Sequence, residues 1–206
     1  MTNIAIIGLG NHPGGKYDLT RHNIGKLLLR QYVDNKGGVF QRKKQFPGST
    51  ANLGDVIVFY PHTFMNCCGN AIARFLNFYK DIERVIIIHD DLDIEFGRLK
   101  QSVSRTTGGH NGLKDIFRYI SKPIERLRIG ISHPRNRNID PSVPNNDKII
   151  KGHNTPVSDY VLQRFYDDEL ESIRRNIPSV IEMIDNIQKM PATLFSNKWH
   201  GLTMFD

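Results

Sequence analysis

Cysteine is scarce in this sequence of 206 residues, and the two cysteines that it has, Cys67 and Cys68, are neighbours. Adjacent cysteines suit neither an ordinary disulfide nor a metal site, because such a site needs several spaced ligands. We therefore expect two reduced thiols in the core, a state typical of a reducing compartment.

Long apolar runs are also missing. No segment approaches the roughly 18 consecutive apolar residues of a membrane span, and the N-terminus lacks the charged and apolar regions of a signal peptide. No linker rich in Pro, Ser or Gly divides the chain, and 39% of its residues are hydrophobic, which is enough for a full core. We expect one domain over residues 1–206, a monomer without a membrane partner, in the cytoplasm or in an organelle.

Positive charge is concentrated in one window. The chain has a formal net charge of +7, and residues 98–137 hold ten Lys or Arg against two acidic residues, a net charge of +8. A localised positive field attracts polyanions and releases the counterions of their phosphates, which indicates a nucleic acid or another phosphate-rich partner. A solvated basic face without a partner is the alternative.

The chain begins with a strand pattern followed by a glycine-rich turn. Residues 4–7 are β-branched or small and uncharged, which is typical of a strand buried on both faces. Asn11 and His22 then fall where open α/β sheets bind their ligands, and His22 is the best candidate for a catalytic base. A dinucleotide-binding loop is the alternative, but the third glycine of that motif is displaced and no strand ending in an acidic residue follows.

Strand and helix patterns alternate along the rest of the chain, which predicts an α/β fold. A long proline-rich stretch, residues 133–158, has no periodicity and is predicted to be a flexible lid or binding loop near the ligand. Further strands are expected at 49–52 and 55–60, paired as a hairpin, and at 85–88, 97–103 and 127–131. Helices are expected at 23–32, 71–79, 113–120, 159–165 and 167–189, the last broken by Pro178.

Carboxylates follow the most plainly buried strand, because residues 85–88 run directly into His89, Asp90 and Asp91. One of these carboxylates could hold the second ring nitrogen of His22 and stabilise its imidazolium. A His-Asp metal pair is the alternative, but no further His and Asp lie at a suitable spacing on helices. We expect neither a metal nor a cofactor.

The helix at 113–120 follows a glycine-rich loop. Its apolar residues face inward, while Lys114, Asp115 and Arg118 are predicted to face outward. Lys114 and Arg118 are four residues apart near the helix N-terminus, which favours phosphate binding there.

Five blocks of the sequence, taken in order, resemble the bacterial-type peptidyl-tRNA hydrolases. Each block alone is weak, but five in the right order are highly specific, and Asn197 and His200 also fit. The blocks are Gly8-Leu9-Gly10-Asn11 with Thr20-Arg21-His22-Asn23, then Thr63-Phe64-Met65-Asn66, His89-Asp90-Asp91-Leu92-Asp93, Gly108-Gly109-His110-Asn111-Gly112-Leu113-Lys114 and Leu127-Arg128-Ile129-Gly130-Ile131.

This resemblance implies a single α/β domain with a twisted mixed β-sheet flanked by helices. It also implies an esterase that cleaves the bond between a peptide and the ribose of tRNA and so recycles tRNA. His22 would then be the general base, Asp90 would orient it, and Asn11 would distinguish blocked from free aminoacyl ends. The residues expected to contact substrate or tRNA, from the resemblance and from the basic window, are Tyr17, Phe64, Met65, Asn66, His110, Asn111, Lys114, Arg118 and Arg128.

The loop after Asn11 departs from the family pattern. His12 is an extra residue after Asn11, and it lengthens the loop that sets the distance from Asn11 to His22.

A non-catalytic RNA-binding relative on the same scaffold, of the kind recruited to splicing, is the alternative function. Loss of catalytic residues would mark such a relative, whereas His22, Asp90 and the three asparagines at 11, 66 and 111 are all present.

Overall fold

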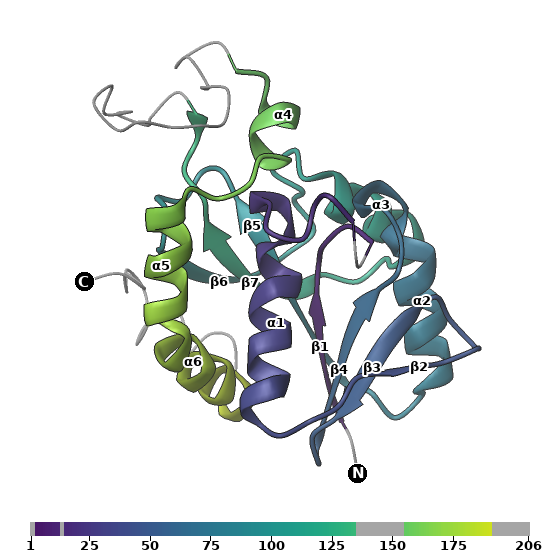
Figure 1. The fold of residues 1–206 in the computed structure, drawn as a ribbon. Coiled ribbons are helices and arrows are strands. Elements are labelled where there is room, and N and C mark those ends of the chain that lie inside the picture. The colour runs from purple at the N-terminus through teal and green to yellow at the C-terminus, as the bar shows by residue number, and fades with distance from the viewer. Residues whose placement is uncertain (1–2, 13–14, 135–154, 191–206) are drawn as a thin grey trace.

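The structure, a computed structural model, describes residues 3–12, 15–134 and 155–190. Within these ranges seven strands form one mixed sheet in the order β2-β3-β4-β1-β5-β7-β6 (Figure 1). The central strands run parallel and are β1 (Ile4–Gly8), β4 (Val56–Pro61), β5 (Arg84–Asp91) and β7 (Ile124–Gly130). The outer strands are antiparallel to their neighbours and are β2 (Gln41–Arg42), β3 (Gly48–Asn52) and β6 (Leu99–Ser104). The predicted α/β fold, and the hairpin that β3 and β4 form, are confirmed.

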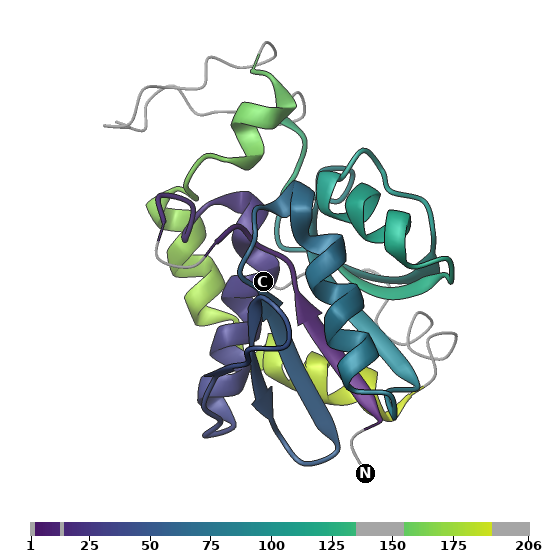
Figure 2. The same ribbon diagram turned by 90° about the vertical axis from the view of Figure 1, so that its right-hand side faces the viewer.

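Helices cover both faces of the sheet, as Figures 1 and 2 show from two sides. Successive side chains of a strand point to opposite faces, so Ile6 belongs to one buried cluster and Ile7 to the other. The β-branched run at the start of the chain therefore builds both layers at once. The first face carries α1 (Ile24–Asn35), α5 (Asp167–Arg175) and α6 (Ile177–Lys189), and the second carries α2 (Cys68–Phe78) and α3 (Asn111–Tyr119).

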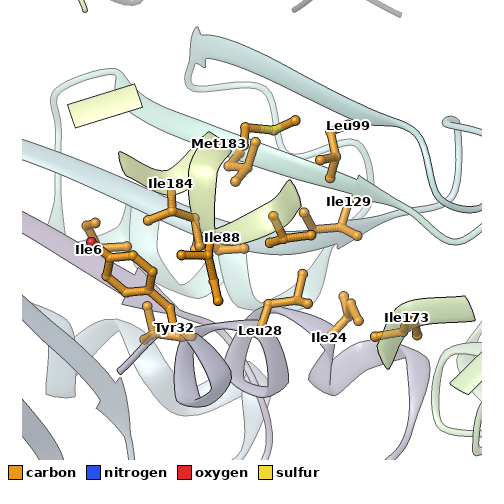
Figure 3. Packing of buried hydrophobic residues seen from close by; sticks show 14 of the residues in the cluster. Ile6, Ile24, Leu28, Tyr32, Ile88, Leu99, Ile129, Ile173, Met183 and Ile184 are labelled. Atoms are coloured by element: carbon orange, nitrogen blue, oxygen red, sulfur yellow. The ribbon is translucent and has the colours of Figure 1, made fainter. Parts of the chain in front are cut away.

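The larger buried cluster joins the C-terminal helices to the sheet. Figure 3 shows Leu28 and Tyr32 of α1, Ile88 of β5, and Met183 and Ile184 of α6 gathered in one layer. Each of these side chains is at most 4% exposed. Complete burial of one such apolar side chain contributes about 1.5 to 3 kcal/mol to folding, so this layer holds the last helix firmly on the sheet.

Glycine brings α1 directly against the sheet. A Cβ atom at Gly25 would lie 2.2 Å from the carbonyl oxygen of Ile88, and one at Gly8 would lie 2.6 Å from the carbonyl oxygen of Gly25. No larger residue fits at either contact. The close approach carries the turn before α1, and with it His22, onto the end of β5.

The helix predicted over residues 167–189 is divided as expected. Helix α5 ends at Arg175, and α6 begins at Ile177 with Pro178 in its first turn. Proline is tolerated there because the first N–H groups of a helix have no partner within it.

The outward position predicted for Asp115 is wrong. Its side chain is buried, and its Oδ2 accepts a hydrogen bond from the backbone N–H of Gly69 at 2.7 Å. A Cβ atom at Gly69 would lie 2.4 Å from the backbone oxygen of Asp115. Glycine thus lets α2 and α3 pack closely, and the carboxylate caps a free N–H group in the first turn of α2.

The region around the predicted 133–158 loop is described only in part. Residues 135–154 of that loop lie outside the described ranges, as do Asn197 and His200. The helix expected at 159–165 is instead α4 (Val157–Val161), and Arg164 forms an isolated β-bridge with Thr20. Among the described residues, no helix has the length and apolar character to cross a membrane.

Candidate active site

Three neighbouring parallel strands end at one edge of the sheet, and each supplies residues there. Asn11 follows β1, Met65 follows β4, and Asp90 is near the end of β5. Strand β1 lies between β4 and β5, and the chain builds the β2-β3-β4 side after β1 before it crosses from β4 to β5 on the other side. Open α/β sheets bind ligands at such a switch point, and the strand ends predicted from the sequence do meet there.

His22 lies against Asp90. It is carried by η1 (Arg21–Asn23), a single 3-10 turn before α1. Its Nδ1 atom is 2.9 Å from Oδ1 and 3.0 Å from Oδ2 of Asp90, and both side chains are buried. Among the described residues, no hydrogen bond reaches Nε2. The proton therefore sits on Nδ1 toward the carboxylate, and Nε2 keeps a lone pair.

His110 holds the same carboxylate from the other side. Its Nδ1 atom accepts hydrogen bonds from the backbone N–H groups of Gly112 at 3.1 Å and Leu113 at 3.3 Å, so the ring caps the N-terminus of α3. The remaining proton must lie on Nε2, which is 3.0 Å from Oδ1 of Asp90. His110 was expected to contact substrate. Both of its nitrogens are bonded to protein groups, so only the rest of the ring is left for such a contact.

The charges of this cluster shift its pKa values. Burial lowers the pKa of His22, but the charge and hydrogen bond of Asp90 more than compensate, so the pKa lies above the ordinary value of 6.5. Burial alone would raise the pKa of Asp90, yet His22 and His110 hold it well below its ordinary value of 3.8. Asp90 is therefore ionised at neutral pH.

His89 lies beneath His110, with ring centroids 5.0 Å apart. Burial, and then the nearby His110, lower the pKa of His89 to about 3. Its Nδ1 donates to the backbone oxygen of Asp90 at 2.6 Å. His89 is thus a neutral core residue that fixes the backbone of Asp90.

His22, Asp90 and His110 bring three possible metal-ligand atoms within 4.8 Å of one another. The expectation that no suitable histidine accompanies the His-Asp pair is therefore wrong in geometry. The hydrogen bonds nevertheless argue against a metal. Because Nδ1 of His110 accepts two N–H groups, its Nε2 could present a lone pair only as an imidazolate, whereas metal-binding histidines normally donate from the second nitrogen. The cluster fits a hydrogen-bonded array around one carboxylate.

A pocket opens over this cluster, and His22, Asp90 and His110 all line it. Its walls come from the glycine-rich loop before α3 and from α4, which projects beyond the strand ends (Figure 1). The further lining residues include Thr107, Gly109, Asn111, Val157, Ser158 and Val161. His22 thus lines the pocket, and Nε2 is the ring nitrogen that Asp90 leaves unbonded.

Asn11 is fixed from several sides. Its backbone N–H donates to Oδ1 of Asn23 at 2.8 Å, and its own Oδ1 accepts from the backbone N–H of Met65 at 2.9 Å. Nζ of Lys26 donates to the backbone oxygen of Asn11 at 3.2 Å and to Oδ1 of Asp18 at 2.9 Å. The side-chain oxygen of Asn11 is thus bonded within the protein. Its side-chain NH2 group is left to donate to a ligand.

Lys26 fixes the loop that contains His12 at both of its ends. Its side chain is only 3% exposed, and it ties the start of the lengthened loop to the turn that contains Asp18. Burial lowers the pKa of Lys26, against the effect of Asp18. Asn11 is therefore held in place at the start of this loop.

The other predicted contact residues surround this edge. Phe64 is 60% exposed, Asn66 and Asn111 are exposed, and Tyr17 is half-buried with Nζ of Lys16 5.1 Å from the centre of its ring. Met65 is buried and serves through its backbone N–H. Of this group, only Asn111 lines the pocket beside His22.

The basic residues are less free than the sequence indicates. Nε of Arg128 donates to Oδ2 of Asp91 at 2.7 Å, and Nη1 of Arg118 lies 3.3 Å from Oδ1 of Asp115. Arg126 is buried and donates to the backbone oxygen of Thr106. Lys114 is exposed, and no ion pair involves it within the described ranges. Arg126 and Arg128 therefore support the fold, whereas Lys114 and Arg118 remain at the surface.

Sequence reasoning missed three contributions to this site: His110 as a partner of Asp90, Lys26 as a clamp, and Arg21 in the turn of His22. A histidine two residues before a helical glycine was a weak signal for a cap. The sequence carries no signal for the roles of Arg21 and Lys26, because charged residues are usually exposed. The partner of Arg21 also lies 148 residues away in the chain.

Comparison with known proteins completes the description. The family model described as Peptidyl-tRNA hydrolase matches residues 5–203. A Rickettsia canadensis protein named peptidyl-tRNA hydrolase is 34% identical over 200 residues, which cover 95% of this chain and 98% of that protein. One of the same name from Sulfurovum sp. is 36% identical over 175 residues, covering 84% and 83%. The crystal structure of peptidyl-tRNA hydrolase from Acinetobacter baumannii matches with a TM-score of 0.79 at 30% identity, covering 99% and 98%.

Proposed function

Because the chain belongs to the peptidyl-tRNA hydrolase family, we propose that it is an enzyme that hydrolyses the ester bond between peptide and tRNA in peptidyl-tRNA, and so returns tRNA to translation. The observation that carries this proposal is the contact of His22 Nδ1 with Asp90, which leaves Nε2 available at the pocket. An activated water suffices to hydrolyse an ester.

In this mechanism His22 is the general base. Its Nε2 takes a proton from a water molecule, the water oxygen forms a bond with the ester carbonyl carbon, and the carbonyl becomes an oxyanion. The bond from that carbon to the ribose oxygen then breaks, and the leaving oxygen takes the proton from His22. Asp90 keeps the proton of Nδ1 in place and stabilises the imidazolium that forms between these steps.

The asparagine amides supply hydrogen-bond donors. Asn11 presents its NH2 group because its carbonyl is held by Met65, while Asn66 and Asn111 are exposed at the same edge of the sheet. Such donors stabilise a developing oxyanion or hold the peptide next to the ester. We assign Asn11 to recognition of the blocked amino end, and Tyr17 and Phe64 to contact with the substrate end.

The tRNA phosphates are assigned to Lys114, Arg118 and Arg128. Lys114 and Arg118 lie along α3, beside the loop that borders the pocket, and Arg128 is on β7. Phosphate contacts position a nucleic acid without reading its sequence, which suits an enzyme that accepts many tRNAs. We further propose that the enzyme acts as a monomer in the cytoplasm, where ribosomes release such substrates. Size-exclusion chromatography with light scattering tests whether the protein is a monomer.

The non-catalytic alternative is not favoured. A scaffold that only binds RNA has no need for a buried carboxylate shared by two histidines, because burying an ionised group costs free energy even when the group is paired. The retention of His22, Asp90 and the three asparagines supports hydrolysis.

The test compares three reactions of the purified protein. N-acetylaminoacyl-tRNA is the blocked substrate, unblocked aminoacyl-tRNA is the control for Asn11, and a chelator tests the metal alternative. We expect cleavage of the blocked substrate only, unchanged by the chelator. Binding of tRNA without cleavage would favour the non-catalytic alternative, and loss of activity in chelator would favour a metal.

A further inference from the structure

Arg21, the residue before His22, is entirely buried in a cage of aromatic rings. Its side chain has 0% exposure. The centre of its guanidinium lies 4.6 Å from the ring centroid of Tyr160, 5.0 Å from that of Tyr166 and 5.4 Å from that of Phe165. Stacking on ring faces favours arginine over lysine, because the planar group fits between them.

Within the part of the chain that the structure describes, one carboxylate, that of Glu169, pairs with Arg21. Nη2 lies 2.7 Å from Oε2 of Glu169, whose side chain is 2% exposed, and Nη1 donates to the backbone oxygen of Arg164 at 2.9 Å. Oε2 of Glu169 also accepts the backbone N–H of Tyr166 at the start of α5. Nε of Arg21 is buried but has no hydrogen-bond partner among the described residues. Hydrogen bonds alone therefore do not account for the burial of the guanidinium.

The backbone repeats this connection. Thr20 and Arg164 form a β-bridge, the N–H of Arg21 donates to the oxygen of Gln163 at 3.1 Å, and the N–H of Phe165 donates to the oxygen of Leu19 at 3.0 Å. The turn that carries His22 is therefore bound to the segment between α4 and α5. Helix α4, at the start of that segment, supplies a wall of the pocket.

We propose that Arg21 is a positioning residue for catalysis: its cage joins the pocket wall formed by α4 to the turn of His22, and so holds the His22 ring against Asp90. The inference rests on the proposed role of His22 as base. The turn η1 is short and has no side-chain cap of its own, so the cage adds a restraint on its N-terminal side to the one that the contact of Gly25 with Ile88 gives on the other. Reacting groups displaced by about 1 Å can lose about 10²-fold in rate.

The test replaces the charge of Glu169 and keeps its shape. Glu169→Gln can still accept the N–H of Tyr166, but it no longer neutralises Arg21. The matched control is Glu125→Gln. Glu125 is another buried carboxylate, and it pairs at 2.7 Å with Arg84, which lies at the end of β5 opposite to Asp90. Both variants are compared with wild type by thermal unfolding, kcat, KM and the pH dependence of kcat.

We expect both variants to fold with similar losses in melting temperature. Only Glu169→Gln should lower kcat, by about 10- to 100-fold, with KM within about twofold and the midpoint of the pH profile moved down as Asp90 loses its contact with His22. An unchanged kcat in Glu169→Gln, or an equal fall of kcat in both variants, would show that the cage serves stability alone. If Glu169→Gln does not fold, Phe165→Leu removes one ring from the cage and carries the same expectation.

A parallel assay of His22→Ala keeps the two proposals apart. An inactive wild type, or a fully active His22→Ala, contradicts the proposed function itself. An active wild type with an inactive His22→Ala and an unimpaired, folded Glu169→Gln contradicts only the role of the Arg21 cage.

Discussion

Nδ1 of His22 lies 2.9 Å from Oδ1 of Asp90, although 68 residues separate the two in the chain. The same oxygen lies 3.0 Å from Nε2 of His110. One buried carboxylate oxygen therefore orients two rings, and only one of them, His22, keeps a nitrogen free for proton transfer. This asymmetry determines the expected effects of substitutions at the site.

The pH dependence should reveal the Asp90 contact. Because the pKa of His22 is raised, the rising limb of kcat/KM should have its midpoint above pH 6.5 in wild type. In Asp90→Asn, burial remains as the main influence and lowers the pKa, so the midpoint should fall below 6.5 while the rate falls about 10²-fold or more. A midpoint that does not move between the two proteins would contradict the assigned contact.

The same pKa shift has a consequence for stability. A histidine whose pKa is raised in the folded protein stabilises it below the unfolded value of about 6.5 and loses this contribution as pH rises through the folded value. Denaturant unfolding of wild type and His22→Gln at pH 5.5 and pH 8.5 measures it. The difference in unfolding free energy between the two proteins should be larger at the lower pH; an equal or reversed difference would be inconsistent with the raised pKa.

Substitutions of His110 should separate its two bonds. Asparagine is a good N-cap, so His110→Asn should keep the stability of α3 but lose the support of Asp90, with kcat reduced about tenfold. His110→Ala loses both contacts, so its free energy of unfolding should be lower than that of His110→Asn by about 0.5 to 2 kcal/mol, the usual contribution of an N-cap. Urea unfolding and kcat, measured on both variants, test these expectations. Full activity in His110→Asn would exclude a role for His110 in holding Asp90.

Lys26 should matter for catalysis more than for stability. Lys26→Met fills the same space without a charge to bury, and the carboxylate left behind, that of Asp18, is 39% exposed and stays solvated, so the cost in stability should be small. The loop of Asn11 loses its clamp, so we expect kcat/KM to fall about tenfold. Lys36→Met is the control, since Lys36 pairs with Asp185 near the end of the same helix. Equal effects of the two substitutions on kcat/KM would refute the clamp.

Lys114 should act on tRNA binding and not on chemistry. Lys114→Ala removes one phosphate contact, so KM should rise severalfold at unchanged kcat, and the slope of log KM against log salt should decrease by about 1. Lys189→Ala, at the exposed end of α6, is the control. A salt slope that is the same in both variants would remove Lys114 from the tRNA surface.

The contact of His22 with Asp90 could be predicted from the sequence because the reasons for it are local. A buried β-branched strand that runs into carboxylates predicts a crevice residue, and Asp90 is found there. A histidine shortly after the first strand end falls at the same edge of a parallel sheet. Neither inference needs to know how distant segments pack.

The remaining contacts depend on tertiary packing. Asp115 was expected outside because charged residues usually are, and only the close approach of α2 at Gly69 gives it a buried donor. The burial of Arg21 needs three rings from residues 160–166, which no periodicity near residue 21 indicates. The role of His110 depends on the orientation of α3 relative to β5.

The most direct test of His22 as the base is single-turnover cleavage of N-acetylaminoacyl-tRNA by wild type and His22→Asn, with tRNA binding measured on both proteins. The account predicts that binding stays within about threefold and that the rate of cleavage falls by about 10² to 10⁴, the usual contribution of a general base. A folded His22→Asn that binds tRNA and cleaves the ester at close to the wild-type rate would contradict it.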